Sequence, residues 1–173
     1  MTQYLIENGQ QERAVSYLNE FQKEGKLYVQ DNIYSENTII DHILNRKIEY
    51  CNNNGISIKC MVSGVFKGIS DYDMHIILEN LLDNAIEAAL KTDDKRIGVD
   101  IYSDEQAIVI KISNSAEENV LKNNPEMNTT KKDNSYHGYG IKNVCELIKK
   151  NNGTIEYIQL GINTVQCRVL LML

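Results

Sequence analysis

Two asparagines and a glutamate in the middle of the chain have the spacing of one helix face. Asn80, Asn84 and Glu87 stand at positions i, i+4 and i+7. A neutral amide oxygen suits a Mg²⁺ ion that anionic phosphates already hold, because it adds a ligand without adding negative charge. An ordinary solvated helix face is the alternative. The opposite, apolar face of the same helix comprises Leu78, Leu81, Leu82, Ala85, Ile86 and Ala89.

A pair of glycines precedes another expected helix. Gly138 and Gly140 flank Tyr139, directly after His137 and before a helix expected over 141–151. Glycines let the backbone approach a ligand, and the free N–H groups of a helix start can hold phosphate oxygens. The pattern indicates a phosphate contact, with a tight loop-to-helix turn as the alternative.

The segment before these glycines could carry a mobile cation. Residues 115–137 have weak periodicity and contain the only proline of the chain, Pro125. A loop of this length in a compact domain is typically a functional lid or a disordered segment. Within it, Lys131 and Lys132 could neutralise charge on a phosphate, and solvated loop lysines are the alternative.

The apolar pattern predicts the elements that must position these residues. Ser70 is expected to cap a helix whose first turn carries Asp71 and Asp73. Strict alternation over 108–112 predicts a strand. The expected helices cover residues 10–23, 35–54, 71–90 and 141–151. The expected strands cover residues 56–62, 96–103, 106–113, 154–159 and 164–171.

This order of elements predicts an α/β two-layer sandwich. Adjacent strands without strict βαβ alternation argue against a Rossmann fold, and no Walker-type phosphate loop occurs. The helix over 35–54 is expected to turn one stripe toward the core. That stripe comprises Ile39, Ile40, Ile43, Leu44, Lys47 and Ile48.

Composition excludes several classes of function. The chain has 173 residues, 24 of them acidic and 18 basic, and its net charge of −6 argues against nonspecific nucleic-acid binding. No apolar run is long enough for a membrane span and the N-terminus does not resemble a signal peptide, so we expect a cytoplasmic protein. Metal-ligand spacing is absent around the cysteines, which are expected to be reduced thiols. They are Cys51, Cys60, Cys145 and Cys167.

Taken in order, these parts resemble the ATP-binding domain of the GHKL superfamily, which gyrase, heat-shock chaperone ATPases, histidine kinases and mismatch-repair ATPases share. Asn80–Ala88 resembles the N box of sensor histidine kinases, and 131–144 resembles their lid and G2 box. The match is closest to the peptide-pheromone receptor kinases, which have a shortened G1 motif. It covers residues 33–173, while residues 1–30 resemble the C-terminal remnant of the dimerisation and phosphoacceptor helical hairpin.

The resemblance implies a Bergerat ATP-binding fold, in which helices cover one face of a mixed sheet, with ATP and Mg²⁺ as cofactors. Asn84 would bind Mg²⁺ and thereby the phosphates, with Asn80 nearby, and Lys131 would share their catalytic role. Gly138 and Gly140 would hinge the lid and approach the phosphates. The other nucleotide contacts that the resemblance implies in this segment are Lys132, His137 and Tyr139.

Two positions depart from the family pattern. Asn114 stands where the G1 box has an aspartate that binds the adenine amine, and its amide oxygen can still accept that hydrogen bond. Glu87 stands where many histidine kinases have a basic residue, so it would repel phosphate unless Mg²⁺ intervenes.

The resemblance implies transfer of the ATP γ-phosphoryl group to a histidine outside this chain, because His42, His75 and His137 do not match the acceptor context. The fragment is therefore expected to be inactive alone. Asn80 replaces the glutamate base of ATP-hydrolysing relatives, which favours phosphotransfer over hydrolysis. The implied parent is a membrane-anchored homodimer with a response regulator as partner. The alternatives are an anti-sigma-type serine kinase on the same fold and a non-catalytic binding or dimerisation module.

Overall fold

The computed structural model describes residues 33, 35, 37–118, 120–123 and 139–173. The chain divides into two units, Met1–Gln30 and Asp31–Leu173, and all described residues belong to the second. The helices expected near the N-terminus therefore lie outside the described residues. Within the described ranges, no helix is both long and apolar enough to span a bilayer.

Five strands form one mixed sheet in the order β1-β2-β3-β5-β4. The β1–β2 pair is parallel and the other three pairs are antiparallel. The strands are β1 (Ser57–Ser63), β2 (Arg96–Ser103), β3 (Ala107–Ser115), β4 (Thr154–Gln159) and β5 (Thr164–Met172). The helices are α3 (Thr38–Asn53), α4 (Asp71–Leu90), α5 (Val120–Asn123) and α6 (Tyr139–Lys150).

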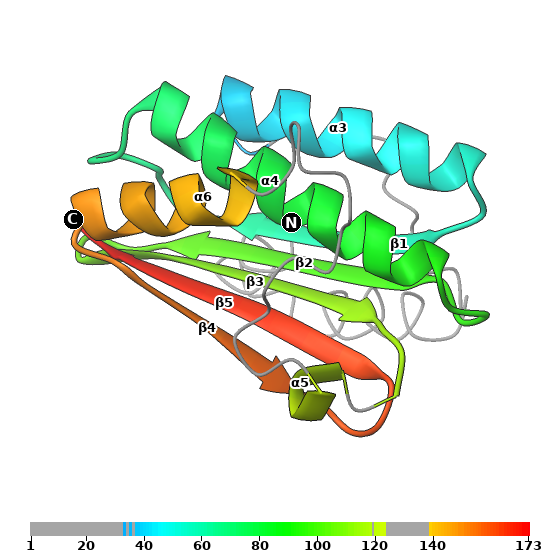
Figure 1. The fold of residues 1–173 in the computed structure, drawn as a ribbon. Coiled ribbons are helices and arrows are strands. Elements are labelled where there is room, and N and C mark those ends of the chain that lie inside the picture. Colours follow the sequence, from blue (N-terminus) through cyan, green and yellow to red (C-terminus); the bar gives the residue numbers. More distant parts are fainter. Residues whose placement is uncertain (1–32, 34, 36, 119, 124–138) are drawn as a thin grey trace, which may run out of the picture. The chain divides into compact units, whose positions relative to one another are not determined.

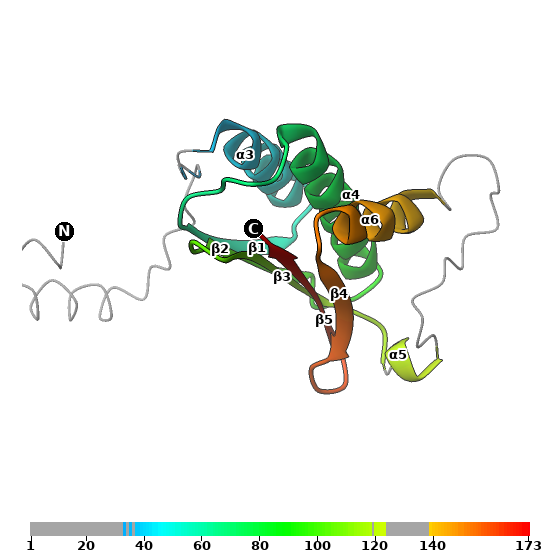
Figure 2. The same ribbon diagram turned by 90° about the vertical axis from the view of Figure 1, so that its left-hand side faces the viewer.

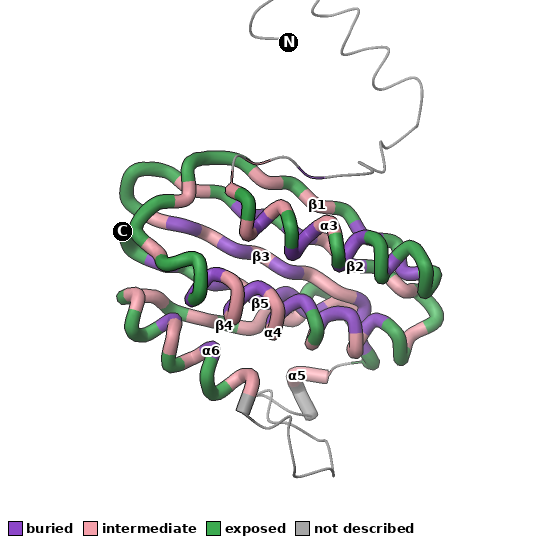
Figure 3. Tube along the Cα trace, turned by 90° about the horizontal axis from the view of Figure 1, so that it is seen from above, coloured by how far each residue is buried: buried purple, intermediate pink, exposed green. Residues whose placement is uncertain are grey.

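The three long helices α3, α4 and α6 cover the same face of the sheet (Figures 1 and 2). Alternate strand residues point toward them, so Ile97, Val99 and Ile101 of β2 are buried while their neighbours are more exposed. Buried residues also line the inner sides of the helices (Figure 3). The predicted two-layer α/β sandwich is confirmed, with helices on one face of a mixed sheet.

Side chains cap the helices as the sequence predicts for α4. The Ser70 hydroxyl accepts a hydrogen bond from the Asp73 backbone N–H at 3.1 Å. Asp73 itself is buried, and its carboxylate accepts hydrogen bonds from Lys150 Nζ (2.9 Å) and Asn151 Nδ2 (3.0 Å). This contact joins the first turn of α4 to the C-terminal end of α6.

Several elements differ from the sequence prediction. Strand β3 continues to Ser115, because its last residues pair with the start of β5 at Thr164. Helix α6 begins at Tyr139, so Gly140 lies inside its first turn rather than before it; the first N–H groups of a helix need no partner within it. The segment expected as one loop over 115–137 contains the short helix α5.

Candidate functional site

The middle of α4 carries the polar face that the spacing predicts. Asn80, Asn84 and Glu87 are each half-buried on this helix. The apolar residues between them, such as Leu81 and Leu82, are buried against the rest of the domain. The core thus holds α4 in place while its amide groups remain partly accessible.

Asn80 lies against the first turn of α6. Its side-chain Nδ2 donates a hydrogen bond to the Ile76 carbonyl at 2.7 Å, which fixes Oδ1 as the outward acceptor. A β-carbon built on Gly140 would lie 2.5 Å from this Oδ1, closer than real β-carbons approach oxygen. A glycine is therefore required at position 140 for α6 to approach the amide as it does. The fold brings together two segments that are 60 residues apart (140 minus 80).

Asn114 lies on the helix-facing side of β3. It pairs with Ile97 and Val165, both of which are buried beneath the helices. Its Nδ2 donates to the Ser115 carbonyl at 2.9 Å, and its Oδ1 has no partner among the described residues. Within the described part of the chain, the amide oxygen is therefore an unpartnered acceptor at the end of a central strand.

Ser115 fixes this end of β3 to the loop after α4. Its hydroxyl lies 2.9 Å from Thr92 Oγ1 and accepts from the Arg96 backbone N–H at 3.1 Å. Thr92 Oγ1 also donates to the Ala89 carbonyl in the last turn of α4, at 2.9 Å. The hydroxyl network therefore ties the Asn114 strand end to the C-terminal end of the helix that carries Asn80 and Asn84.

A cluster of ion pairs that the sequence analysis missed joins α3 to α4. Lys47 Nζ lies 2.8 Å from Glu79 Oε2 and 2.5 Å from Asp83 Oδ1, and Arg46 also pairs with Glu79. Burial acts to lower the pKa of Lys47, but hydrogen bonds and charges from Asp83 and Glu79 outweigh it and raise this pKa. Burial acts to raise the pKa of Glu79, but Lys47 and Arg46 lower it overall. Lys47 and Glu79 are therefore charged at neutral pH.

Several predicted site residues lie outside the described residues: Lys131, Lys132, His137 and Gly138. Tyr139 opens α6, and its side chain is likewise outside the description. The structure thus places Gly140 against Asn80, with Asn84 one helical turn further along α4. It places Asn114 at the strand end that is tied to the end of the same helix.

The donor set fits a magnesium ion that arrives with a phosphorylated ligand. No group of three or more His, Cys, Asp or Glu side chains among the described residues could hold a metal ion. Mg²⁺ keeps several waters and commonly uses only one or two protein oxygens together with substrate phosphates. Asn84 makes no side-chain hydrogen bond with another described residue, so its amide oxygen could serve as such a ligand.

Comparison with known families identifies the class of this domain. Residues 69–170 match the family model described as a GHKL domain. The match covers more than half of the chain, and the chain belongs to the GHKL family. This finding confirms the GHKL resemblance inferred from the N box and the G2 glycines; the match does not extend to the narrower peptide-pheromone receptor subgroup. Curated protein sequences give no match.

Solved structures of histidine kinases share the fold. The catalytic domain of histidine kinase ThkA, in a nucleotide-free form, is 19% identical with a TM-score of 0.61, over 80% of this chain and 93% of that one. The mycobacterial sensor histidine kinase MprB is 16% identical with a TM-score of 0.59, over 80% and 96%. The Acinetobacter baumannii histidine kinase AdeS is 13% identical with a TM-score of 0.56, over 95% and 80%. The domain therefore has the fold of histidine kinase catalytic domains.

Proposed function

We propose that this domain binds ATP with Mg²⁺ and transfers the γ-phosphoryl group to a histidine side chain outside this chain. The observation that carries the proposal is the contact between Asn80 and Gly140. It joins the N box to the first turn of α6, the helix that contains Gly140 and follows Gly138. Phosphoryl transfer needs mainly positioning and charge neutralisation, which such an assembly of amides and helix N–H groups can supply.

Each described residue has a role that its surroundings support. Asn84 would hold Mg²⁺ through its amide oxygen, and Asn80 would stand beside the phosphates. Asn114 would accept a hydrogen bond from the adenine amine. An amide at position 80 cannot deprotonate water, so the site favours transfer to a side chain over hydrolysis.

The remaining contacts extend the proposal beyond the described residues. Lys131 would neutralise charge on the transferred phosphoryl group. The other nucleotide contacts would come from Lys132, His137, Gly138 and Tyr139. Residues 1–30 would be the end of the dimerisation and phosphoacceptor hairpin, with a response regulator as the next phosphoryl acceptor. The domain would work in the cytoplasm, within a dimeric parent kinase of the peptide-pheromone receptor subgroup.

Calorimetric titration with ATP in the presence and absence of Mg²⁺ tests nucleotide binding. We expect Asn84→Ala to abolish the magnesium-dependent part of the affinity while the fold remains intact, because the side chain is not part of the core. Asn53→Ala is the matched control, since Asn53 is an exposed asparagine of α3. Unchanged magnesium dependence in a folded Asn84→Ala variant contradicts the assigned role.

Incubation with γ-labelled ATP and a histidine-containing helical hairpin tests the transfer. A phosphohistidine product is labile to acid, whereas a phosphoserine product is stable. Acid-labile label on the hairpin supports the proposal. Acid-stable label identifies the serine kinase alternative, and an absence of ATP binding identifies the non-catalytic one.

A further inference from the structure

Lys47 is the one buried cation among the described residues. It occupies the stripe of α3 that the sequence analysis expected to face the core, between Leu44 and Ile48. Only 9% of its side chain is exposed. A lysine in this position needs a reason, because an apolar side chain of similar size would fill the space without a desolvation cost.

The partners of Lys47 have a fixed relationship to the site. Glu79 and Asp83 immediately precede Asn80 and Asn84 on α4. One residue advances about 100° around a helix axis, so carboxylates held toward α3 turn the two asparagines away from α3. Asn80 in fact lies against Gly140 of α6. The contacts of Lys47 with both carboxylates therefore add to the apolar packing that fixes the rotation of α4 about its own axis.

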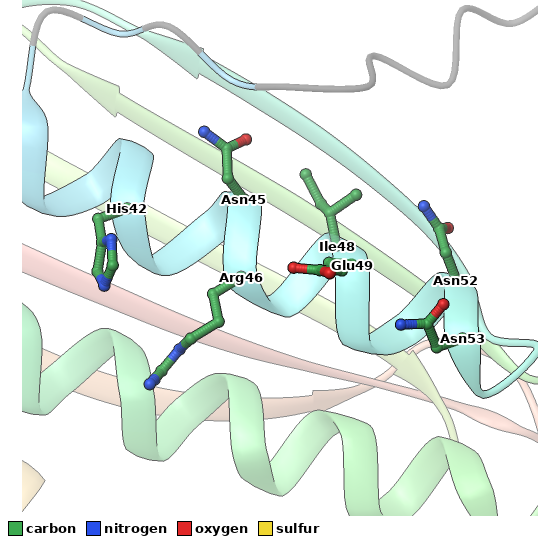
Figure 4. Close-up of a pocket in the computed structure, with 7 residues that line it drawn as sticks. All are labelled: His42, Asn45, Arg46, Ile48, Glu49, Asn52 and Asn53. Atoms are coloured by element: carbon green, nitrogen blue, oxygen red, sulfur yellow. The ribbon is translucent and has the colours of Figure 1, made fainter.

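Arg46 supports the same arrangement from the surface. It pairs with Glu79, and its side chain extends from α3 in the direction of α4 (Figure 4). The cluster thus contains two cations and two carboxylates and is neutral overall. Without Lys47, Arg46 would be the single remaining cation for the two carboxylates, Glu79 and Asp83. The excess negative charge would lie beside the two asparagines, next to the expected phosphate site.

We infer that Lys47 is a positioning residue for nucleotide binding: it helps to fix the rotation of α4 and cancels the charge of Glu79 and Asp83, so that Asn80 and Asn84 can meet the phosphates of Mg·ATP. This inference rests on the proposed function. A positioning role of Lys47 differs from a purely structural role in one measurable respect. A structural ion pair affects every ligand of the folded domain equally, whereas this role affects only ligands that carry phosphates.

The test compares the affinities of Mg·ATP and of adenosine, which lacks phosphates, by titration. We expect Lys47→Met to weaken Mg·ATP binding about 10-fold or more, as is typical when a residue that orients a metal ligand is lost. Adenosine affinity should change less than about twofold, which is within a few tenths of a kcal/mol. Lys47→Arg should retain most of the Mg·ATP affinity. Arg168→Met is the matched control, because it removes the cation of an ion pair with Glu156 between β5 and β4, away from α4.

A second variant separates charge from position. Asp83 is 58% exposed in its side chain, so Asp83→Asn is expected to fold. Added to Lys47→Met, it should restore part of the Mg·ATP affinity by removing the unpaired carboxylate. If Lys47→Met alone fails to fold, the double variant is compared with Asp83→Asn alone. We expect the double variant to bind Mg·ATP more weakly than Asp83→Asn and to bind adenosine equally well.

Three results would overturn the inference. They are an unchanged Mg·ATP affinity in Lys47→Met, an equal loss for adenosine and Mg·ATP, and a double variant that binds Mg·ATP as tightly as Asp83→Asn alone. Failure of the proposed function has a different signature, since the wild-type domain would then bind no Mg·ATP at all.

Discussion

The Cα of Gly140 faces the side-chain oxygen of Asn80 so closely that a β-carbon would lie 2.5 Å from it. Asn80 cannot easily withdraw, because its Nδ2 is hydrogen-bonded to the Ile76 carbonyl. The contact therefore couples the position of α6 to the orientation of an amide in the N box. Any substitution at Gly140 changes that orientation directly.

Gly140→Ala should weaken Mg·ATP binding by about 10-fold, since the added methyl group displaces the Asn80 amide and breaks its hydrogen bond to Ile76. The free energy of unfolding should change by less than about 1 kcal/mol, because alanine favours the helix and offsets the crowding. Titration and urea denaturation measure the two quantities. Gly98→Ala is the control, since its β-carbon would meet Ser113 at an ordinary 4.0 Å. Equal effects of the two alanines on ATP affinity would contradict this prediction.

Asn114→Asp should strengthen adenosine binding by two- to tenfold, because a hydrogen bond to an ionised acceptor is roughly twice as strong as a neutral one. Oδ1 of Asn114, which has no hydrogen-bond partner among the described residues, is the atom that would make this contact. Inosine lacks the exocyclic amine, so its affinity should not increase. Parallel titrations with the two nucleosides give the comparison. A similar gain for inosine would show that Asn114 does not contact the amine.

Asp73→Asn should lower the free energy of unfolding by about 1–3 kcal/mol at pH 7, the cost of disturbing a buried hydrogen-bonded group. Hydrogen bonds from Asn151 and Lys150 lower the pKa of Asp73 below its ordinary value. Its stabilising contribution is thus complete above the unfolded-state pKa of about 3.9 and is lost as pH falls through the lower folded-state value.

Urea denaturation of Asp73→Asn and the wild type at several pH values tests this. The difference in stability should be constant above about pH 5 and should shrink below about pH 4. Asp71→Asn changes an exposed acid of the same helical turn and should have little effect. A difference that grows on acidification would refute the assignment.

Three of the four free cysteines should react slowly with alkylating reagents in the folded domain. Burial raises the pKa of Cys51 to about 11 and the pKa of Cys60 and Cys167 to about 12, so little thiolate is present at neutral pH. Mass spectrometry after timed exposure to iodoacetamide measures the rates, with urea-denatured protein as the control. Labelling of Cys51 and Cys167, which are buried, and of the half-buried Cys60 at the same rate in folded and denatured protein would contradict this prediction.

Local signals were sufficient to predict most of the fold. The Ser70 cap and the apolar repeat placed α4 correctly, and strict alternation over 108–112 identified β3. The ends of β3 and α6 were less predictable because they depend on partners distant in sequence. The last pairs of β3 exist because Thr164 begins the neighbouring strand, and this is not visible near Ser115 itself.

In the site, too, local patterns were predictable and contacts between distant parts of the sequence were not. Spacing along α4 was enough to place Asn80 and Asn84 on one helix face. The roles of Lys47 and Asp73 were missed, because their partners lie far along the chain: Asp83 is 36 residues from Lys47, and Lys150 is 77 residues from Asp73. A lysine in an apolar stripe was the one available sign of a buried ion pair.

Different contacts hold the two ends of α6. Its C-terminal end is held by the buried Asp73, while Gly140 in its first turn lies against Asn80. A helix of 12 residues is about 18 Å long. A tilt of about 5° around the C-terminal end would move the first turn by about 1.5 Å. A tilt of α6 would therefore move Gly140 relative to α4, and a shift of that size would displace the Asn80 amide.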